Sequence, residues 1–200
     1  MKIVPTTDAG LSIAAEAIRA GEIVAYPTEA VYGLGADPFS EKAVRRLFEL
    51  KGREETKPIL LVISDPDQLE RVARRVSPRA AAYAKAFWPG PLSMLFPKAQ
   101  SLAAALTGGA DEVCVRCPGS EIARRLCRAV GGPITSTSAN RAGAPPARAL
   151  PDVNVPGVAV GVDGGTLEPG PPSTVFDPTR RAILREGAVP ASELTAFEPY

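Results

Sequence analysis

Three cationic side chains, Lys51, Arg53 and Lys57, lie within seven residues of one polar segment. Arginine offers a planar fork for two phosphate oxygens and lysine a point charge, so together they suit a polyphosphate. A solvated turn in which Glu54 and Glu55 neutralise these cations is an equally good interpretation of the segment alone. For phosphate binding, we expect the side chains of Lys51 and Arg53 to lie in a solvent-lined cleft.

A second polar group follows an apolar run at residues 133–140. It consists of four hydroxyls and one amide: Thr135, Ser136, Thr137, Ser138 and Asn140. These groups could bind phosphate oxygens, a hydrated magnesium ion or a carboxylate. A turn capped by Asn140 is the alternative. We favour a binding role, because a strand leaving the core seldom ends in so many hydrogen-bonding groups without a polar partner.

The run at residues 26–37 lies between a predicted strand and a predicted helix, where open α/β sheets bind ligands. Gly33 and Gly35 could let backbone amides approach an anion, and Thr28 and Glu29 could orient a small polar substrate. A glycine-rich connector with Tyr32 as a packing residue is the interpretation that this run favours on its own.

Two arginines, Arg116 and Arg185, end predicted strands and could each direct a guanidinium into a cleft. Cys114 and Cys117 match C-x-x-C, but residues three apart in a strand point to opposite faces. Besides these two, the chain contains only Cys127 and no histidine, so a four-ligand zinc site is not expected. We interpret the cysteines as small buried hydrophobic residues.

The composition limits the classes of function. Twenty-three basic residues face 22 acidic ones, so the net charge of +1 indicates no general affinity for nucleic acid or membranes. The absence of histidine excludes Ser-His and Cys-His nucleophile pairs and imidazole acid–base catalysis. No apolar run is long enough to span a bilayer, the N-terminus lacks a signal peptide pattern, and three cysteines are typical of a reducing compartment. We therefore expect a cytoplasmic protein.

Alternating helix and strand patterns predict one α/β domain over residues 1–200, with an open, twisted, mixed sheet flanked by helices. Predicted helices begin at Asp8, Ser40, Ser64, Ser77, Ser120 and Pro190. Predicted strands cover residues 22–26, 59–63, 92–96, 112–116, 134–137, 158–162, 173–177 and 182–185. Residues 141–156 are expected to form a long surface loop.

Six motifs occur in order along the chain: PTEAVYGLG at 27–35, KGR with KP at 51–58, WPGP at 88–91, VCVR at 113–116, STSAN at 136–140 and PSTVFD at 172–177. Each is weak alone, but six in order over roughly residues 10 to 187 are specific. With them the chain resembles the threonylcarbamoyl-AMP synthases of the TsaC/YrdC type. The resemblance implies one YrdC-like domain with its core at about 10–187. It also implies the short form, which lacks the longer relatives' C-terminal domain.

The resemblance also implies roles for individual residues. Lys51, Arg53, Ser138 and Asn140 match the expected catalytic residues around the nucleotide phosphates, and Lys57 and Arg185 match further ATP contacts. Arg116 matches the arginine that binds the threonine carboxylate, with Thr28, Ser136 and Ser173 expected in the same threonine site. Ala30, Val62, Pro146 and Pro172 depart from residues common in the longer relatives.

The implied reaction joins bicarbonate and L-threonine into a carbamate, which attacks the α-phosphate of ATP and releases pyrophosphate. Such a displacement needs alignment, cations and usually Mg²⁺, which we expect ATP to carry, with no tightly bound metal or organic cofactor. The expected partners are ATP, L-threonine, bicarbonate and downstream tRNA threonylcarbamoyl-transfer proteins, with weak tRNA binding and no membrane. Two alternatives stay open: a non-catalytic RNA-binding or ribosome-assembly module, and a carbamoyl-adenylate enzyme with another acceptor.

Overall fold

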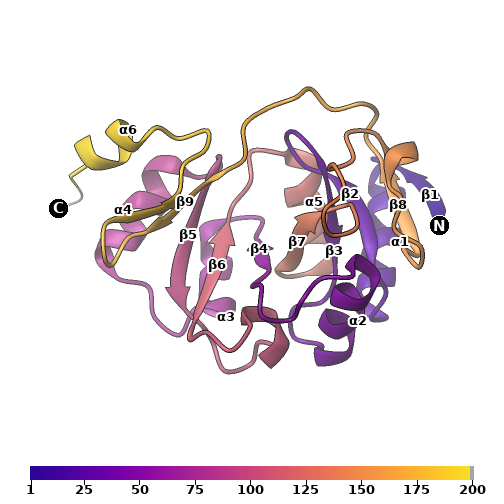
Figure 1. The fold of residues 1–200 in the computed structure, drawn as a ribbon, viewed down its shortest axis with the longest axis horizontal. Helices are drawn as coiled ribbons and strands as arrows, with labels where there is room; N and C mark the ends of the chain where they lie inside the picture. The colour runs from indigo at the N-terminus through magenta and orange to yellow at the C-terminus, as the bar shows by residue number, and fades with distance from the viewer. Residues whose placement is uncertain (199–200) are drawn as a thin grey trace.

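The fold was obtained as a computed structural model, which describes residues 1–198. Ten strands form one sheet in the order β1-β8-β2-β3-β7-β4-β6-β5-β9-β10 (Figure 1). The strands are β1 (Lys2–Pro5), β2 (Val24–Pro27), β3 (Tyr32–Gly35), β4 (Leu60–Val62), β5 (Leu92–Pro97), β6 (Glu112–Arg116), β7 (Ile134–Ser138), β8 (Val160–Asp163), β9 (Thr174–Asp177) and β10 (Ala182–Arg185). The sheet contains both parallel and antiparallel pairs, which confirms the predicted mixed α/β fold.

The helices are α1 (Asp8–Arg19), α2 (Glu41–Lys51), α3 (Leu69–Val72), α4 (Pro78–Phe87), α5 (Glu121–Val130) and α6 (Ala191–Ala196), with short 3-10 helices η1 (Pro66–Gln68), η2 (Ala104–Thr107) and η3 (Leu150–Asp152). Ser40, Ser77 and Ser120 cap α2, α4 and α5, each by accepting a hydrogen bond from the backbone N–H three residues later. The first helix begins at Asp8 as predicted, but Asp8 is not its capping residue. The hydroxyl of Thr7 caps α1, and Asp8 is its first helical residue.

Strand β3 was not predicted, because its sequence Tyr32-Gly-Leu-Gly35 contains two glycines. The ring of Tyr26 on β2 explains them, since an added Cβ would lie 3.3 Å from this ring at Gly33 and 3.0 Å at Gly35. The glycines therefore let an aromatic side chain lie across the neighbouring strand. Both glycines lie on an inner strand of the sheet, because β3 pairs with β2 on one side and with β7 on the other. The proposed anion contact through these two glycines was wrong, and Tyr32 is a buried packing residue.

The chain between β7 and β8 is only partly the surface loop that was predicted. Most of residues 141–156 are exposed, but Ala147, Leu150 and Val155 are buried in the core, and η3 lies within the segment. The backbone oxygen of Ala147 accepts a hydrogen bond from the N–H of Tyr32 at 2.8 Å. This hydrogen bond holds the segment against the first residue of β3, near the polar end of β7.

Two groups of buried side chains fill the interior. One joins α1 and α5 to strands β1, β2, β7 and β8, and the larger one joins α2, α3 and α4 to the remaining sheet surface. The last strands, β9 and β10, lie at the opposite end of the molecule from β1 and β8 (Figure 1). In residues 1–198, no helix combines the length and the apolarity needed to cross a membrane.

Candidate functional site

A row of partly exposed side chains crosses the middle of the sheet. Leu60 on β4 pairs with Ser136 on β7, and Leu95 on β5 pairs with Cys114 on β6. Leu61 pairs with Val115, which places Leu60 beside Cys114. Paired residues point to the same face, so these four side chains share one open surface, whereas Leu61 and Val115 point to the buried face.

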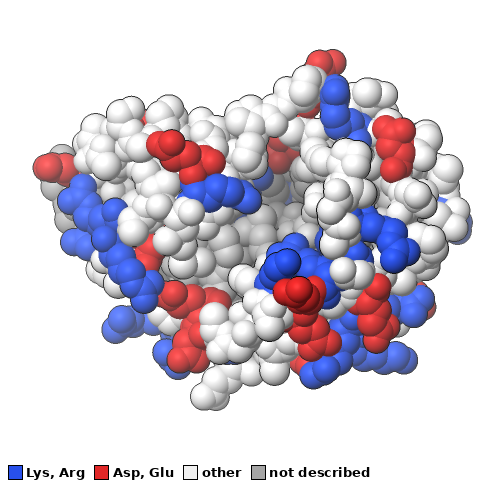
Figure 2. Space-filling model, in the orientation of Figure 1, with Lys and Arg blue, Asp and Glu red and all other residues white. Residues whose placement is uncertain are grey.

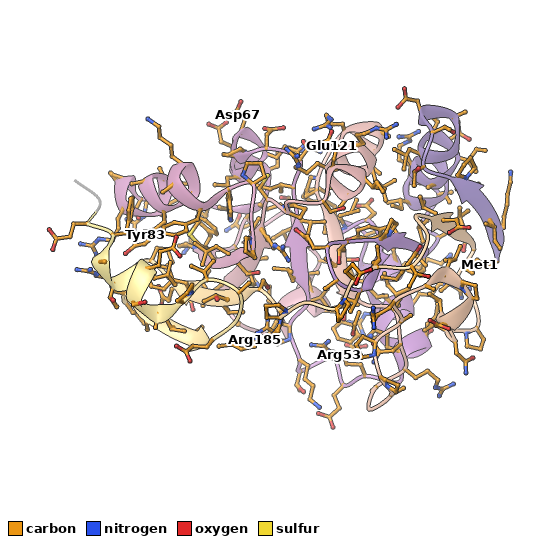
Figure 3. All side chains as sticks on the ribbon, turned by 90° about the horizontal axis from the view of Figure 1, so that it is seen from above. Met1, Arg53, Asp67, Tyr83, Glu121 and Arg185 are labelled. Atoms are coloured by element: carbon orange, nitrogen blue, oxygen red, sulfur yellow. The ribbon has the colours of Figure 1, made fainter. Side chains whose placement is uncertain are left out.

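The molecule is hollowed at the centre of the face drawn in Figure 2, and lysine and arginine side chains gather on opposite rims of the hollow. Arg53 and Arg185 lie on the same side of the molecule, as the view from above shows (Figure 3). These two arginines are 132 residues apart in the sequence, and the fold brings both to the side of the molecule that carries the hollow. The surface between them is suited to an anionic ligand.

Lys51 does not lie in a solvent-lined cleft, and that expectation was wrong. Its residue is only 3% exposed, and its ammonium donates to the backbone oxygens of Ser138 at 2.5 Å and Asn140 at 2.8 Å, and to Asn140 Oδ1 at 3.3 Å. Ser138 Oγ in turn donates to Asn140 Oδ1. Lys51 thus fastens the end of α2 to the polar segment 138–140. Burial, and then the charge of Arg53, lowers the pKa of Lys51 to about 8.

We expect Lys51→Met to lower the free energy of unfolding, because buried acceptors left without a donor cost about 1–3 kcal/mol. Lys51 has a pKa of about 8 in the folded chain and about 10.4 when unfolded. Between these values the unfolded state binds more protons, so the stability of the wild type relative to Lys51→Met should rise with pH from about 8 to 10. Chemical denaturation at several pH values measures both effects.

Lys42→Met is the matched control, since Lys42 is an exposed lysine of the same helix. It should leave stability unchanged across the same pH range. Equal unfolding free energies for wild type and Lys51→Met would contradict the buried bridge.

Arg53 lies beside the end of β7, at the rim of the hollow. Its Nη1 donates to Thr137 Oγ1 at 3.2 Å and its Nη2 to the backbone oxygen of Pro58 at 2.9 Å. Its Nε is buried and has no hydrogen-bond partner in residues 1–198, and burial lowers the pKa of the guanidinium. Lys57 is exposed in the same loop, where its ammonium lies 3.7 Å from a carboxylate oxygen of Glu54. Both the cationic and the self-neutralised interpretations of this loop therefore have a structural basis.

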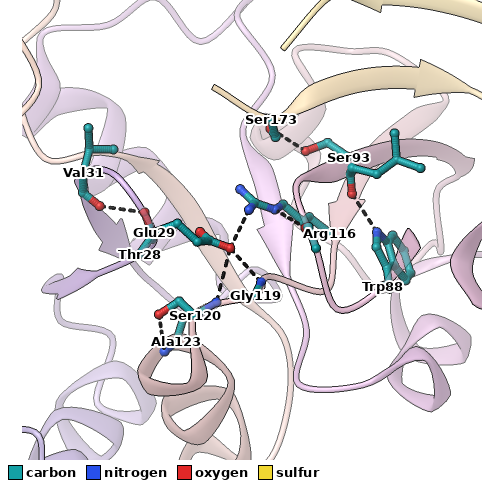
Figure 4. A network of polar contacts seen from close by, with 12 residues as sticks. Thr28, Glu29, Val31, Trp88, Ser93, Arg116, Gly119, Ser120, Ala123 and Ser173 are labelled. Carbon is teal, nitrogen blue, oxygen red and sulfur yellow. Dashed lines mark hydrogen bonds and ion pairs between the residues drawn. The ribbon is translucent and has the colours of Figure 1, made fainter. Parts of the chain in front are cut away.

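Arg116 lies next to the first turn of α5 (Figure 4). Its Nε donates to the backbone oxygen of Gly90 at 2.8 Å, and its Nη2 forms an ion pair with Glu29 Oε1 at 2.5 Å. Only 12% of its side chain is exposed. Burial lowers the pKa of Arg116, and the carboxylate of Glu29 acts in the opposite direction.

The third part of the site is the end of the chain around Ser173. Ser173 Oγ accepts a hydrogen bond from Ser93 Oγ at 2.8 Å (Figure 4). Arg185 Nη2 donates to the backbone oxygen of Ser173 at 2.8 Å. Thr28 is in the turn before β3, where its hydroxyl donates to the backbone oxygen of Val31 at 2.6 Å. The residues proposed from sequence thus lie at the end of α2 and in the loop after it, at the end of β7, in the 28–31 turn, at the end of β6 and around β9 and β10.

Sequence reasoning gave Ser93 no role in the proposed site. Ser93 is buried on β5, which lies between β9 and the strand that carries Arg116, but an isolated serine in an apolar strand gives no signal of a role. Glu29 was expected only to orient a small polar substrate together with Thr28, and its pairing with Arg116 was not predicted. Its contact with Arg116 joins residues 87 positions apart, and no local pattern encodes such a pair.

The three cysteines are all free thiols. Cys117 and Cys127 are buried as predicted, whereas the residue Cys114 is partly exposed on the open face of β6. Burial raises the pKa of the Cys114 thiol to about 12, and the charge of Arg185 opposes this shift. Burial also raises the pKa of Cys117 to about 11, so neither thiol is a ready nucleophile.

We expect the double variant Cys114→Ala, Cys117→Ser to keep the activity that is proposed below. Cys117 Sγ donates to the backbone oxygen of Ser64 at 3.4 Å, and a serine hydroxyl at this position would need the same partner. The variant should lose about 1–3 kcal/mol of stability, from the gap left at position 114 and the buried hydroxyl at 117. Elemental analysis of the wild type should find no stoichiometric zinc. Loss of activity without unfolding would contradict this interpretation.

Comparison with known proteins agrees with the fold. The family model Sua5/YciO/YrdC, described as "Telomere recombination", matches residues 16–187. The threonylcarbamoyl-AMP synthase of Pyrococcus abyssi is 41% identical over 92% of this chain, which spans 56% of that relative's length. The threonylcarbamoyl-AMP synthase of Alkalilimnicola ehrlichii is 42% identical over 86% of this chain and 90% of its own.

A solved structure matches the fold closely. The crystal structure of P. abyssi Sua5 complexed with L-threonine superposes with a TM-score of 0.91 at 38% identity, covering 97% of this chain and 60% of that one. The family match contains the cationic loop, the polar end of β7, Arg116 and Arg185. From the family match over residues 16–187, these identities and the shared fold, the chain belongs to the Sua5/YciO/YrdC family.

Proposed function

We propose that this chain forms threonylcarbamoyl-AMP from L-threonine, bicarbonate and ATP, with release of pyrophosphate. The observation that carries the proposal is the gathering of arginines on the hollowed side of the molecule. Arg53 and Arg185 lie on that side, and Arg116 lies beside the first turn of α5. The names of the relatives and the threonine bound to P. abyssi Sua5 support the same assignment.

The proposed reaction needs no protein nucleophile. Threonine nitrogen and bicarbonate form a carbamate with loss of water. A carbamate oxygen then bonds to the α-phosphorus of ATP as the bond to the bridging oxygen of pyrophosphate breaks. Fixed cations and hydrogen-bond donors stabilise the charge that develops on the phosphate oxygens. The absence of histidine is compatible with such a mechanism.

In this proposal Arg53 binds the nucleotide phosphates, with its guanidinium held in place by Thr137 and the backbone oxygen of Pro58. Arg185 and Lys57 add positive charge at the rims, and Arg116 binds the threonine carboxylate. The proposed threonine site is lined by Ser173, Ser136 and Thr28. Lys51 holds Ser138 and Asn140 in place, as its three hydrogen bonds indicate.

Mg²⁺ enters this proposal as part of the substrate Mg–ATP. The side-chain oxygens of Ser138 and Asn140 are neutral. Ser138 Oγ donates to Asn140 Oδ1, which also accepts a hydrogen bond from the ammonium of Lys51. Neutral oxygens of this kind suit a hydrated ion whose charge is balanced by phosphate. The proposal also includes a cytoplasmic location, weak tRNA binding, and delivery of the unstable product to separate tRNA threonylcarbamoyl-transfer proteins.

One experiment tests the activity and the choice of amino acid together. The protein is incubated with Mg–ATP, bicarbonate and a panel of amino acids, and pyrophosphate and adenylate products are followed by mass spectrometry. We expect an adenylate whose mass corresponds to threonine. An adenylate carrying another amino acid, or none, would point to the alternative carbamoyl-adenylate chemistry. Absence of any adenylate or pyrophosphate would contradict the proposal.

A second measurement separates the enzyme from an RNA-binding module. ATP and threonine should each raise the melting temperature, because a ligand that binds only the native state stabilises it by mass action. Short RNAs should bind weakly and lose affinity sharply between low and physiological salt. Nanomolar, salt-resistant RNA binding with no response to ATP would favour the RNA-binding module.

A further inference from the structure

The carboxylate of Glu29 meets three donors at one oxygen. Glu29 Oε1 accepts hydrogen bonds from Arg116 Nη2 at 2.5 Å, from the N–H of Gly119 at 2.6 Å and from the N–H of Ser120 at 3.2 Å (Figure 4). Gly119 and Ser120 lead into α5, and Ser120 caps it. The side chain of Glu29, from the 28–31 turn, therefore accepts hydrogen bonds at the N-terminus of α5 and also contacts the guanidinium of Arg116 at the end of β6.

The turn that carries Glu29 is itself fixed. Both the N–H and the hydroxyl of Thr28 donate to the backbone oxygen of Val31, at 3.1 and 2.6 Å. Ser120 Oγ reaches back to the backbone oxygen of Pro27 at 3.4 Å. The carboxylate is thus presented from a short, internally bonded turn, and its place does not depend on a long flexible segment.

We propose that Glu29 is a positioning residue that orients the guanidinium of Arg116 for the substrate carboxylate. This proposal rests on the proposed function. Two contacts determine the plane of the guanidinium: Nε is held by the oxygen of Gly90 and Nη2 by Glu29. Nη1 makes no hydrogen bond to any residue from 1 to 198, so one edge of the fork is left for a ligand. A bidentate arginine contact is effective only when that plane is set in advance.

The negative charge of Glu29 also stabilises the buried guanidinium of Arg116. The side chain of Arg116 is only 12% exposed, and a guanidinium that has lost its water is stabilised by a carboxylate at hydrogen-bond distance. Glu29 is 35% exposed, and its second oxygen makes no hydrogen bond within the described residues. The pair is therefore asymmetric: Arg116 is enclosed and held, while Glu29 remains partly in contact with solvent.

A simpler role must be distinguished from this one. A carboxylate at a helix N-terminus stabilises the helix through its free N–H groups and dipole, whatever Arg116 does. If Glu29 were only a cap, its removal would lower the melting temperature without changing the KM for threonine. If it positions Arg116, the KM for threonine changes and the KM for ATP does not.

The test is a double-mutant cycle on kcat/KM for threonine, with Glu29→Ala, Arg116→Lys and the combined variant. Glu29→Ala should lower kcat/KM for threonine about 10- to 100-fold, because a displacement of about 1 Å in a binding group can have this effect. In the Arg116→Lys background the same change should have less than about a threefold effect, since the fork to be oriented is gone. Glu29→Gln, which keeps an oxygen for Gly119 and Ser120, should fall between wild type and Glu29→Ala.

Glu121→Gln is the matched control, because Glu121 lies in the first turn of the same helix and pairs with Arg124 and Arg128 instead of Arg116. It should leave kcat/KM for threonine within about twofold of wild type. Equal effects of Glu29→Ala in both backgrounds would overturn the proposal, as would a loss shared by threonine and ATP.

A crystal structure of Glu29→Ala supplies a readout that does not depend on activity. The guanidinium of Arg116 should leave its contact plane or adopt more than one conformation. An unchanged Arg116 would overturn the positioning role even if the enzyme works as proposed. A wild type that makes no threonine adenylate would instead overturn the proposed function, while the position of Arg116 would still decide the role of Glu29.

Discussion

Replacing Arg53 with alanine should lower the rate of threonylcarbamoyl-AMP formation by about 10²-fold or more, with only a small change in stability. The guanidinium lies at the rim of the hollow and already forms two hydrogen bonds, to Thr137 and to the backbone of Pro58. These contacts hold it in place before the nucleotide arrives. Their loss should cost about 1 kcal/mol of folding stability, far less than the loss of a preorganised charge at the reacting phosphate. Pyrophosphate release and thermal melting measure the two quantities.

Arg45→Ala is the control for the Arg53 variant. Arg45 is an exposed arginine of α2 whose ion pairs are with Glu41 and Glu55. Its removal should leave the rate within about twofold of wild type, because exposed ion pairs contribute little. Full activity of Arg53→Ala would remove the cationic loop from the mechanism.

Arg116→Ala should lower kcat/KM for threonine by roughly 10²- to 10³-fold, in line with the 2–5 kcal/mol lost when one partner of a buried, hydrogen-bonded charge pair is removed. The change removes the proposed carboxylate partner and leaves Glu29 facing only the two N–H groups at the head of α5. The KM for ATP should stay within about threefold, since the proposal assigns Arg116 to the threonine carboxylate and not to the nucleotide. Steady-state kinetics with each substrate varied in turn separates these effects.

The control for Arg116 is Arg125→Ala, because Arg125, in the middle of α5, pairs with Asp8 of α1 and not with Glu29. The Arg125→Ala variant should have the same kcat/KM for threonine as the wild type. An Arg116→Ala enzyme that saturates with threonine as the wild type does would show that another group binds the carboxylate.

Local features of the fold could be predicted from the sequence because local contacts produce them. Ser40, Ser77 and Ser120 each accept from an N–H three residues later, so the capping residue and its partner lie within one turn. Strand β6 and its alternation were likewise predicted, since alternate residues face opposite sides of a strand. The same kind of pattern failed at β3, where two glycines reduce the strand propensity and only the ring of Tyr26 explains them.

Lys51 shows most clearly what sequence reasoning could not decide. The residue type and the loop indicated a cation for phosphate, but its environment comes from Ser138 and Asn140, almost ninety positions away along the chain. Three oxygens at the end of β7 surround its ammonium, and burial then lowers its pKa. Whether a lysine is a free cation or an internal bridge depends on such distant neighbours.

By itself, the sequence determined the family, the mixed α/β class and most residues of the candidate site, because motif order and local periodicity are written along the chain. Only the tertiary structure decided which of those side chains face one another. It paired Glu29 with Arg116 and placed Arg53 and Arg185 on one side of the molecule. The physical reason is that hydrogen-bond geometry and burial depend on strand pairing and loop packing between distant segments, which no single stretch of sequence specifies.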